Sequence, residues 1–234
     1  NHTCPWCYIN WHQSGTQSKR SGNTAVNKPL NASKKLIKAV KDAASLGLKA
    51  VTIVGDGEPT LHKNFIEYIN SLKSFGLNLG IFSNMSTEKK EVLQTMAKNF
   101  FFVRCSLDAA RPDVHEKSHG RKDFNKVISN IKTILKMRGK NIFPIIGVQY
   151  VTNHNNYKDL PYAANFYRKL GVDYLTIKPQ FKNVLNPNHD ENLLDPNVVN
   201  PLMKQAQKYA TDKYKVYAKY SQFEAALNFK TNDG

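Results

Sequence analysis

Cysteines, long apolar runs and acidic side chains are scarce in this 234-residue chain, and each shortage excludes a class of protein. The three cysteines, at positions 4, 7 and 105, are too few for the disulfide framework of a small secreted domain. We therefore expect a reducing, cytoplasmic setting. No apolar run of about 18 residues occurs, which predicts that no segment spans a membrane. Hydrophobic residues still make up 41% of the chain, enough for a folded core.

Acidic residues number 18 against 34 Lys and Arg, which gives a formal net charge of +16. Such a charge is compatible with anionic partners, including nucleic acid, phosphorylated substrates or an acidic peptide. The lysines are spread over every predicted helix, and no arginine cluster is visible, although arginine is the usual residue for phosphate and base recognition. We interpret the charge mainly as a solvated surface and keep nucleic acid as an alternative partner.

The spacing of apolar residues predicts an α/β fold built from repeated strand–helix units. Strands are expected at 49–54, 77–83, 100–107, 145–151 and 172–177. Helices are expected from Asn31 or Ser33 to about 46, and at 61–75, 87–98, 123–137 and 157–170. Short turns between these elements imply parallel strands with outer helices, curled into a full or partial barrel.

The sequence changes in character after Pro179, and we place a domain boundary between residues 182 and 183. Residues 1–182 are expected to form the barrel, and residues 183–234 a C-terminal extension. In the extension we expect a loop up to Pro201, a helix at 201–211 and a strand at 214–220.

Cys4 and Cys7 form a C-x-x-C motif with Pro5 and Trp6 inside it. The motif is compatible with half a zinc site, a thiol–disulfide redox pair or part of an iron–sulfur loop. No second pair follows to complete a zinc site, and no predicted helix begins at Cys7, as a thioredoxin-type motif requires. Cys105 is single, and alternation along its strand predicts a buried, apolar position.

A second motif, Gly55-Asp56-Gly57-Glu58-Pro59-Thr60-Leu61, follows the strand predicted at 49–54. Its glycines allow the backbone to approach a ligand closely. Together the two motifs resemble the radical S-adenosylmethionine (radical SAM) superfamily, which carries C-x3-C-x2-C and, one strand later, a G-G-E-P-type turn. Asp56 stands at the second position of that turn. The family's first cysteine would fall immediately before Asn1 and its first strand upstream, so we expect that the chain is a fragment.

The resemblance implies a partial (βα)6 TIM-like barrel with two cofactors, a [4Fe–4S] cluster ligated by Cys4 and Cys7 and SAM. Trp6 would lie near the adenine, and the turn at 55–59 would bind the methionine amino group through backbone carbonyls, with Glu58 nearby. Arg121 suits a carboxylate, and polar residues at strand ends suit the ribose. The predicted SAM-binding residues are Trp6, Gly55, Asp56, Gly57, Glu58, Pro59, Ser83, Asn84, Ser106, Asp108, Arg121, Gln149 and Lys178.

For Asp108 and the histidines a purely structural role is also compatible with the sequence, and two other predicted residues are candidates only. Asp108 would also suit a helix or turn cap, and Gln149 and Lys178 are candidates because they lie on later strands. The histidines expected at the surface or in caps are His12, His62, His115, His154 and His189.

The resemblance implies an enzyme that cleaves SAM reductively to a 5′-deoxyadenosyl radical, which abstracts hydrogen from a peptide, a protein or a small molecule. An electron donor such as flavodoxin or ferredoxin would act with it. The extension is similar to the bridge that leads to a SPASM or Twitch segment in one branch of the family. Two alternatives remain: a radical SAM enzyme that modifies RNA, and a non-enzymatic module that binds zinc or nucleic acid.

Overall fold

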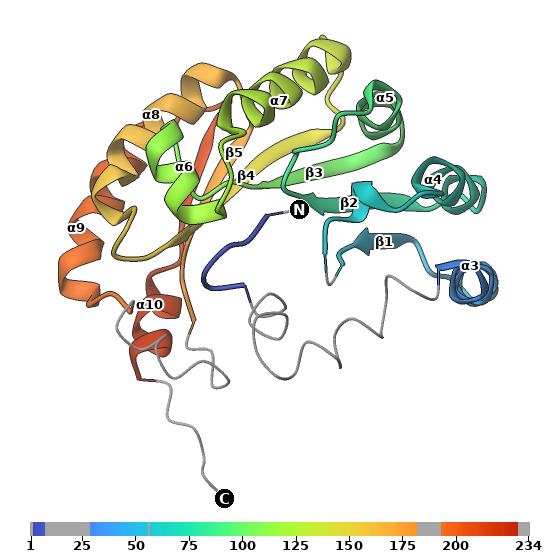
Figure 1. The fold of residues 1–234 in the computed structure, drawn as a ribbon, viewed down its shortest axis with the longest axis horizontal. Helices are drawn as coiled ribbons and strands as arrows, with labels where there is room; N and C mark the ends of the chain where they lie inside the picture. Colours follow the sequence, from blue (N-terminus) through green and yellow to red (C-terminus); the bar gives the residue numbers. More distant parts are fainter. Residues whose placement is uncertain (1, 8–28, 56, 182–192, 229–234) are drawn as a thin grey trace, which may run out of the picture. The chain divides into compact units, whose positions relative to one another are not determined.

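The computed structural model describes residues 2–7, 29–55, 57–181 and 193–228, which are coloured in Figure 1. The chain divides into two compact units. The first unit comprises residues 1, 12–105 and 126–146, and the second comprises residues 2–11, 106–125 and 147–234. The domain boundary predicted between residues 182 and 183 lies outside the described residues.

Parallel strands alternate with helices, so the predicted α/β fold is confirmed. Over the described residues the sheet has six strands in the order β1-β2-β3-β4-β5-β6, which is also their order along the chain. The strands are β1 (Ala50–Ile53), β2 (Asn78–Ser83), β3 (Phe100–Ser106), β4 (Ile145–Thr152), β5 (Tyr174–Pro179) and β6 (Lys215–Ala218). Within each unit the strands run parallel, so their carboxyl ends lie at one edge.

The first unit holds β1 to β3, which pair in parallel, and their helices cover one face (Figure 1). Ile69 and Leu72 of the covering helices, together with Ile81 of β2, have no exposed surface. Burying these side chains stabilises the packing of helix on sheet, because each Å² of apolar surface removed from water contributes about 25 cal/mol of free energy. The helical segments are α3 (Pro29–Ser45), the 3-10 turn η1 (Pro59–Leu61), α4 (Phe65–Ser74), α5 (Lys90–Asn99) and most of α7 (Phe124–Arg138).

The second unit holds β4 to β6, again parallel. Gly147 of β4 lets the ring of Tyr174 on β5 lie against the backbone, because a Cβ added at this glycine would come 1.9 Å from the ring. β6, expected within a separate extension, pairs with β5 and continues its sheet. The helical segments are α6 (Pro112–His119), the 3-10 turn η2 (Tyr157–Asp159), α8 (Leu160–Leu170), α9 (Pro196–Gln207) and α10 (Tyr220–Leu227).

Several predicted boundaries were wrong, for local physical reasons. The helix expected at 61–75 is split, because His62 is extended (φ −61°, ψ 126°) between η1 and α4. α9 begins at Pro196 rather than Pro201, because the Asp195 carboxylate accepts the Asn197 amide and caps the helix there. α6 and α10 were not predicted. None of the described helices is long and apolar enough to cross a membrane.

Candidate functional site

The C-x-x-C motif forms a tight turn in the second unit. The Cys7 amide donates to the Cys4 carbonyl over 2.9 Å, with Pro5 and Trp6 at the corner of the turn. Proline fixes its own φ and so favours such a corner. Cys4 and Cys7 are half-buried, and both are free thiols. The turn therefore offers two unbridged sulfurs close together in the chain.

The loop that carries this turn is attached to the end of α6. The Thr3 amide donates to the His119 carbonyl over 2.9 Å. Gly120, the residue after α6, has φ +66°, and a Cβ added to it would lie 2.0 Å from Thr3 Oγ1. Only glycine permits both this backbone conformation and the close approach of Thr3.

The environment of Cys4 does not suit a redox-active thiol. Burial raises the pKa of the Cys4 thiol above its ordinary value, and the nearby charges of Asp108 and Cys7 raise it further. Reactive cysteines of the thioredoxin kind have lowered pKa values. A coordinating metal, in contrast, deprotonates a thiol outright. Two thiols in one turn are the donor type that iron–sulfur clusters take, so this turn fits part of a cluster's ligand set.

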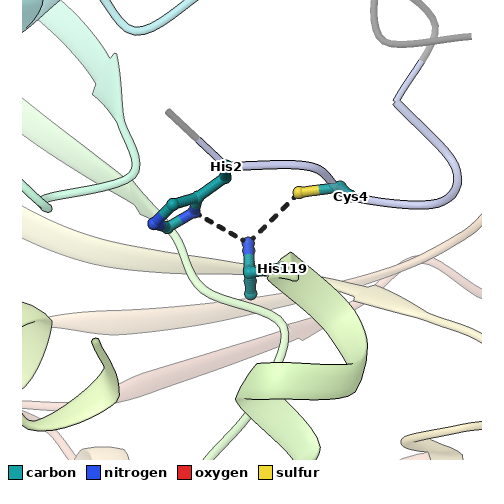
Figure 2. Close-up of side chains that lie close together, drawn as sticks. All are labelled: His2, Cys4 and His119. Carbon is teal, nitrogen blue, oxygen red and sulfur yellow. Dashed lines mark hydrogen bonds between the residues drawn. The ribbon is translucent and has the colours of Figure 1, made fainter. Parts of the chain in front are cut away.

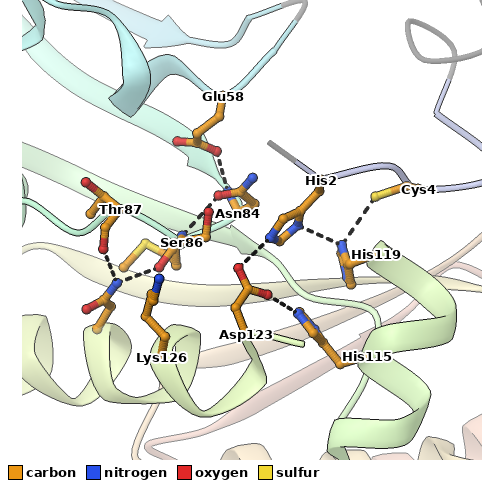
Figure 3. Close-up of polar contacts among 12 residues, drawn as sticks. His2, Cys4, Glu58, Asn84, Ser86, Thr87, His115, His119, Asp123 and Lys126 are labelled. Atoms are coloured by element: carbon orange, nitrogen blue, oxygen red, sulfur yellow. Dashed lines mark hydrogen bonds and ion pairs between the residues drawn. The ribbon is translucent and has the colours of Figure 1, made fainter. Parts of the chain in front are cut away.

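Three histidines and an aspartate lie beside the cysteine turn, as Figure 3 shows. His119 Nδ1 is 3.3 Å from Cys4 Sγ and 3.3 Å from His2 Nδ1 (Figure 2). Asp123 contacts two of the histidines: His2 Nε2 is 3.1 Å from its Oδ2, and His115 Nε2 is 2.8 Å from its Oδ1. We call these four residues, His2, His115, His119 and Asp123, the histidine cluster.

Burial and hydrogen bonds set the charges in the histidine cluster. Burial lowers the pKa of His2 and His115, only partly opposed by Asp123, and lowers that of His119 well below its ordinary value. For Asp123, burial alone would raise the pKa, but the hydrogen bonds from His115 and His2 outweigh it and lower the pKa. The cluster is therefore a set of neutral imidazoles around one carboxylate.

The histidine cluster was missed by the sequence analysis. His115 was expected at the surface or in a cap, which is wrong, because it has no exposed surface. A signal existed: Pro112 and Gly120 bracket a short helix. Positions 115 and 119 are four apart, so the two imidazoles share one face of that helix. Of the other histidines, His62 and His154 are exposed, as expected, whereas His12 and His189 lie outside the described residues.

In the first unit, Glu58 connects the turn after β1 to the end of β2. Its Oε1 accepts hydrogen bonds from Thr60 N (3.2 Å), Thr60 Oγ1 (2.7 Å) and Ser83 Oγ (2.7 Å). Its Oε2 accepts the Asn84 amide over 2.7 Å (Figure 3). Among the described residues Oε2 accepts this one hydrogen bond, and a carboxylate oxygen can accept a further donor. Predicted residues Glu58, Ser83 and Asn84 are thus brought together.

The backbone after β2 is fixed by α7. The side-chain amide of Asn130 donates to the carbonyls of Met85 and Thr87, each over 2.8 Å. Met85 has φ +59°, a left-handed conformation that non-glycine residues rarely adopt. The Met85 amide donates to the side chain of Ser83 over 3.0 Å, which stabilises the turn at residues 83–85. This support fixes the positions of Ser83 and Asn84.

The remaining residues of the predicted turn are accessible. Gly55 and Gly57 are exposed, and Pro59 is half-buried. A Cβ added at Gly55 would lie 2.9 Å from the Gly57 carbonyl oxygen, whereas one added at Gly57 would meet nothing within 4 Å. Gly57 therefore borders open space, as a backbone that approaches a ligand requires. Asp56 lies outside the described residues.

Asp108 is buried in the second unit, at the carboxyl end of β3. Its Oδ1 accepts the Val151 amide over 2.7 Å, and its own amide donates to His119 Nε2 over 3.1 Å. Burial raises the pKa of the Asp108 carboxyl to about 7, although the Val151 hydrogen bond and the Lys178 charge act in the opposite direction. Within the second unit, Asp108 therefore connects β4 to α6.

The other predicted residues of the second unit differ in exposure. Ser106, Gln149 and Lys178 are half-buried, and Lys178 lies close enough to Asp108 to affect its pKa. Arg121 is exposed. Cys105, in the first unit, has no exposed surface, which confirms the expectation that it is a buried residue.

Comparison with known proteins decides the family. A family model described as the Radical SAM superfamily matches residues 1–167. This region includes both the turn at Cys4–Cys7, which we call the cysteine turn, and the turn at Gly55–Pro59, which we call the Glu58 turn. The chain belongs to the radical SAM superfamily. The resemblance drawn from its two motifs is thereby confirmed.

Individual relatives of the superfamily match parts of the chain. It is 31% identical over 133 residues to the tungsten-containing aldehyde ferredoxin oxidoreductase cofactor-modifying protein of Pyrococcus furiosus, covering 56% of this chain and 37% of that protein. It is 25% identical over 137 residues to a protein of Thermococcus kodakarensis named probable GTP 3′,8-cyclase, covering 58% of this chain and 40% of that protein. The chain therefore spans less than half the length of these relatives.

The fold is that of solved radical SAM proteins. The structure of SuiB from Streptococcus suis bound to S-adenosylmethionine matches 97% of this chain and 50% of its own, with a TM-score of 0.73 and 14% identity. SuiB bound to its precursor peptide SuiA matches 92% of this chain and 46% of its own, with a TM-score of 0.69 and 15% identity. At such identities the likeness shows the fold alone, and it confirms the partial TIM-like barrel.

Proposed function

We propose that this protein is an enzyme that cleaves SAM reductively and uses the resulting radical on a substrate. The observation that carries the proposal is the superfamily match over residues 1–167. This region contains the cysteine turn, whose two thiols form no disulfide, and the Glu58 turn, which a hydrogen bond from Ser83 to Glu58 stabilises. The superfamily supplies the cofactors, a [4Fe–4S] cluster and SAM. When bound, the cluster supplies the electron that breaks the sulfonium C–S bond, giving methionine and a 5′-deoxyadenosyl radical.

Cys4 and Cys7 hold the cluster through their thiolates. The turn hydrogen bond between them and the Thr3–His119 hydrogen bond hold the loop in this conformation. A loop ordered in advance loses less conformational entropy on binding.

The Glu58 turn binds the methionine part of SAM. Gly55, Gly57 and Pro59 present backbone carbonyls to its ammonium group, and for Asp56, which lies outside the described residues, the sequence-based prediction of a SAM contact stands as a proposal. Glu58 supports this interaction with a negative charge close by and with Oε2, which can accept a further donor. Ser83 and Asn84 hold Glu58 in place and contribute polar groups for the ribose.

For the second unit we propose SAM contacts of its own. Trp6 packs near the adenine, Ser106 binds the ribose, and the exposed Arg121 is free to turn toward the SAM carboxylate. Gln149 and Lys178 remain candidates for adenine or substrate contacts. For Asp108 we propose an indirect role, because its carboxylate already accepts the Val151 amide and is buried.

For the substrate, we propose a peptide or protein side chain. The support is that SuiB, whose fold matches this chain, has been solved with a precursor peptide bound. We also propose that the segment after residue 182 leads to a SPASM or Twitch element, and that flavodoxin or ferredoxin is the electron donor. The charge of +16 favours one alternative substrate, RNA. RNA binding that weakens steeply with added salt would support it, because phosphate contacts release counterions.

Metal analysis tests the proposal. The native protein, purified without oxygen, should contain iron and acid-labile sulfide and be brown. Cys4→Ser should lose most of this iron, whereas Cys105→Ala, which removes the buried thiol of the first unit, should keep it. Zinc with no iron or sulfide would contradict the proposal and favour a zinc-binding module.

A further inference from the structure

His119 is in hydrogen-bonding distance of a sulfur that the proposed function makes a cluster ligand. Its Nδ1 lies 3.3 Å from Cys4 Sγ, and Figure 2 shows the ring edge directed between that sulfur and His2. His119 is almost completely buried, with 2% of its surface exposed. Water therefore does not compete strongly for this nitrogen.

The contact at the other ring nitrogen decides which nitrogen carries the proton. The Asp108 amide lies 3.1 Å from His119 Nε2, and a backbone N–H can only donate, whereas the carboxylate Oδ2 of Asp108 is 3.6 Å from this nitrogen, beyond hydrogen-bond distance. Nε2 must therefore accept and carry no proton, which places the proton of the ring on Nδ1. Because Asp108 is itself held by the Val151 amide, this assignment is built into the fold.

The rest of the histidine cluster fixes where the Nδ1 proton points. Asp123, an acceptor at both oxygens, receives His2 Nε2–H and His115 Nε2–H. His2 is then left with an acceptor nitrogen, Nδ1, which is 3.3 Å from His119 Nδ1. The His119 N–H thus has two acceptors, the His2 nitrogen and the Cys4 sulfur. A thiolate is anionic and is the stronger of the two, because hydrogen bonds to charged acceptors are about twice as strong.

We propose that His119 is a positioning residue that donates an Nδ1–H hydrogen bond to the Cys4 thiolate and thereby raises the reduction potential of the cluster. The inference rests on the proposed function. Hydrogen bonds to cluster sulfurs are among the factors that set the reduction potential. The physical reason is that an N–H dipole directed at sulfur stabilises the more negative, reduced cluster. Accepting an electron from the donor then becomes easier.

Two substitutions at one position separate this role from simple packing. His119→Leu fills a similar volume without any donor, whereas His119→Asn retains an N–H group near the place of Nδ1. Both remove the acceptor for the Asp108 amide, so they disturb that contact equally. His154→Asn changes an exposed histidine of the same unit and serves as the control.

The readout is the ratio of reduced to oxidised cluster in a redox titration followed by electron paramagnetic resonance. At a fixed solution potential, His119→Leu should lower this ratio about tenfold, which equals 59 mV for a one-electron couple. His119→Asn and His154→Asn should stay close to the native protein. A native midpoint potential in His119→Leu with full iron and sulfide content would overturn the proposal.

A measurement on the native protein, with His119→Asn as its control, covers the case in which His119→Leu fails to fold or to hold iron. Native protein labelled with 15N in histidine alone should show a 15N coupling to the reduced cluster in pulsed paramagnetic resonance. The coupling should disappear in His119→Asn, whose side chain is unlabelled, and its absence from the native protein would overturn the proposal. If the native protein holds no iron or sulfide, it is the proposed function that fails.

Discussion

Ser83 Oγ donates to Glu58 Oε1 over 2.7 Å and so joins the carboxyl ends of β2 and β1 through side chains. The carboxylate that receives this bond also accepts three further hydrogen bonds, from the amide and hydroxyl of Thr60 and from the Asn84 amide. Glu58 is therefore a structural centre of the turn as well as a proposed SAM contact. The two roles can be tested separately.

Glu58→Gln should destabilise the folded protein. The amide keeps one acceptor oxygen but turns an NH2 group toward a donor of the turn, leaving at least one half-buried donor unpaired. We expect the free energy of unfolding in urea to fall by about 1–3 kcal/mol. Glu67→Gln, on the exposed face of α4, should change it little. Equal stability of the two variants would show that the Glu58 hydrogen bonds do not hold the turn.

The raised pKa of Asp108 should make the free energy of unfolding depend on pH. Its pKa is about 7 in the folded protein against 3.8 for an ordinary aspartate, so between these pH values the folded state holds a proton that the unfolded state has released. Stability contributed by this group is therefore lost as pH rises from about 4 to 7. The difference amounts to about 4 kcal/mol, at about 1.4 kcal/mol per pKa unit.

Asp108→Asn should remove this dependence, because the amide does not titrate and its oxygen can still accept the Val151 amide. The measurement is the urea midpoint at intervals between pH 4 and 7 for the variant and the native protein. Asp113→Asn, at an exposed position of α6, is the control. Parallel curves for Asp108→Asn and the native protein would show that the carboxyl does not hold the extra proton.

Gly120 should be more sensitive to a methyl group than Gly139. Both have positive φ, +66° and +59°, so alanine at either position costs about 1–2 kcal/mol in backbone strain. Only at Gly120 would the methyl group also meet Thr3, at 2.0 Å; at Gly139 the nearest atom is 3.9 Å away. Gly120→Ala should therefore displace the cysteine loop and lose iron, while Gly139→Ala is destabilised in urea but keeps its iron. Equal iron content in the two variants would contradict the docking of the loop on α6.

Local patterns in the sequence predicted the strand–helix alternation and the cofactor motifs. Apolar periodicity identified β2 and α7 within a few residues, and the Cys4–Cys7 and Gly55–Pro59 motifs pointed to one superfamily. Contacts between distant residues could not be predicted in this way. The Glu58–Ser83 hydrogen bond joins positions 25 apart, and His119 meets Cys4 across 115 residues. His115 was misjudged because burial depends on the packing around α6, a helix with too few apolar residues to show a period.

The central claim is that this protein cleaves SAM by one-electron reduction. The most direct test is anaerobic incubation of the iron-loaded native protein with dithionite and SAM, followed by chromatography of the products. We predict 5′-deoxyadenosine and methionine in equal amounts, and none from Cys7→Ser. An iron- and sulfide-loaded native protein that forms no 5′-deoxyadenosine under these conditions would contradict the claim.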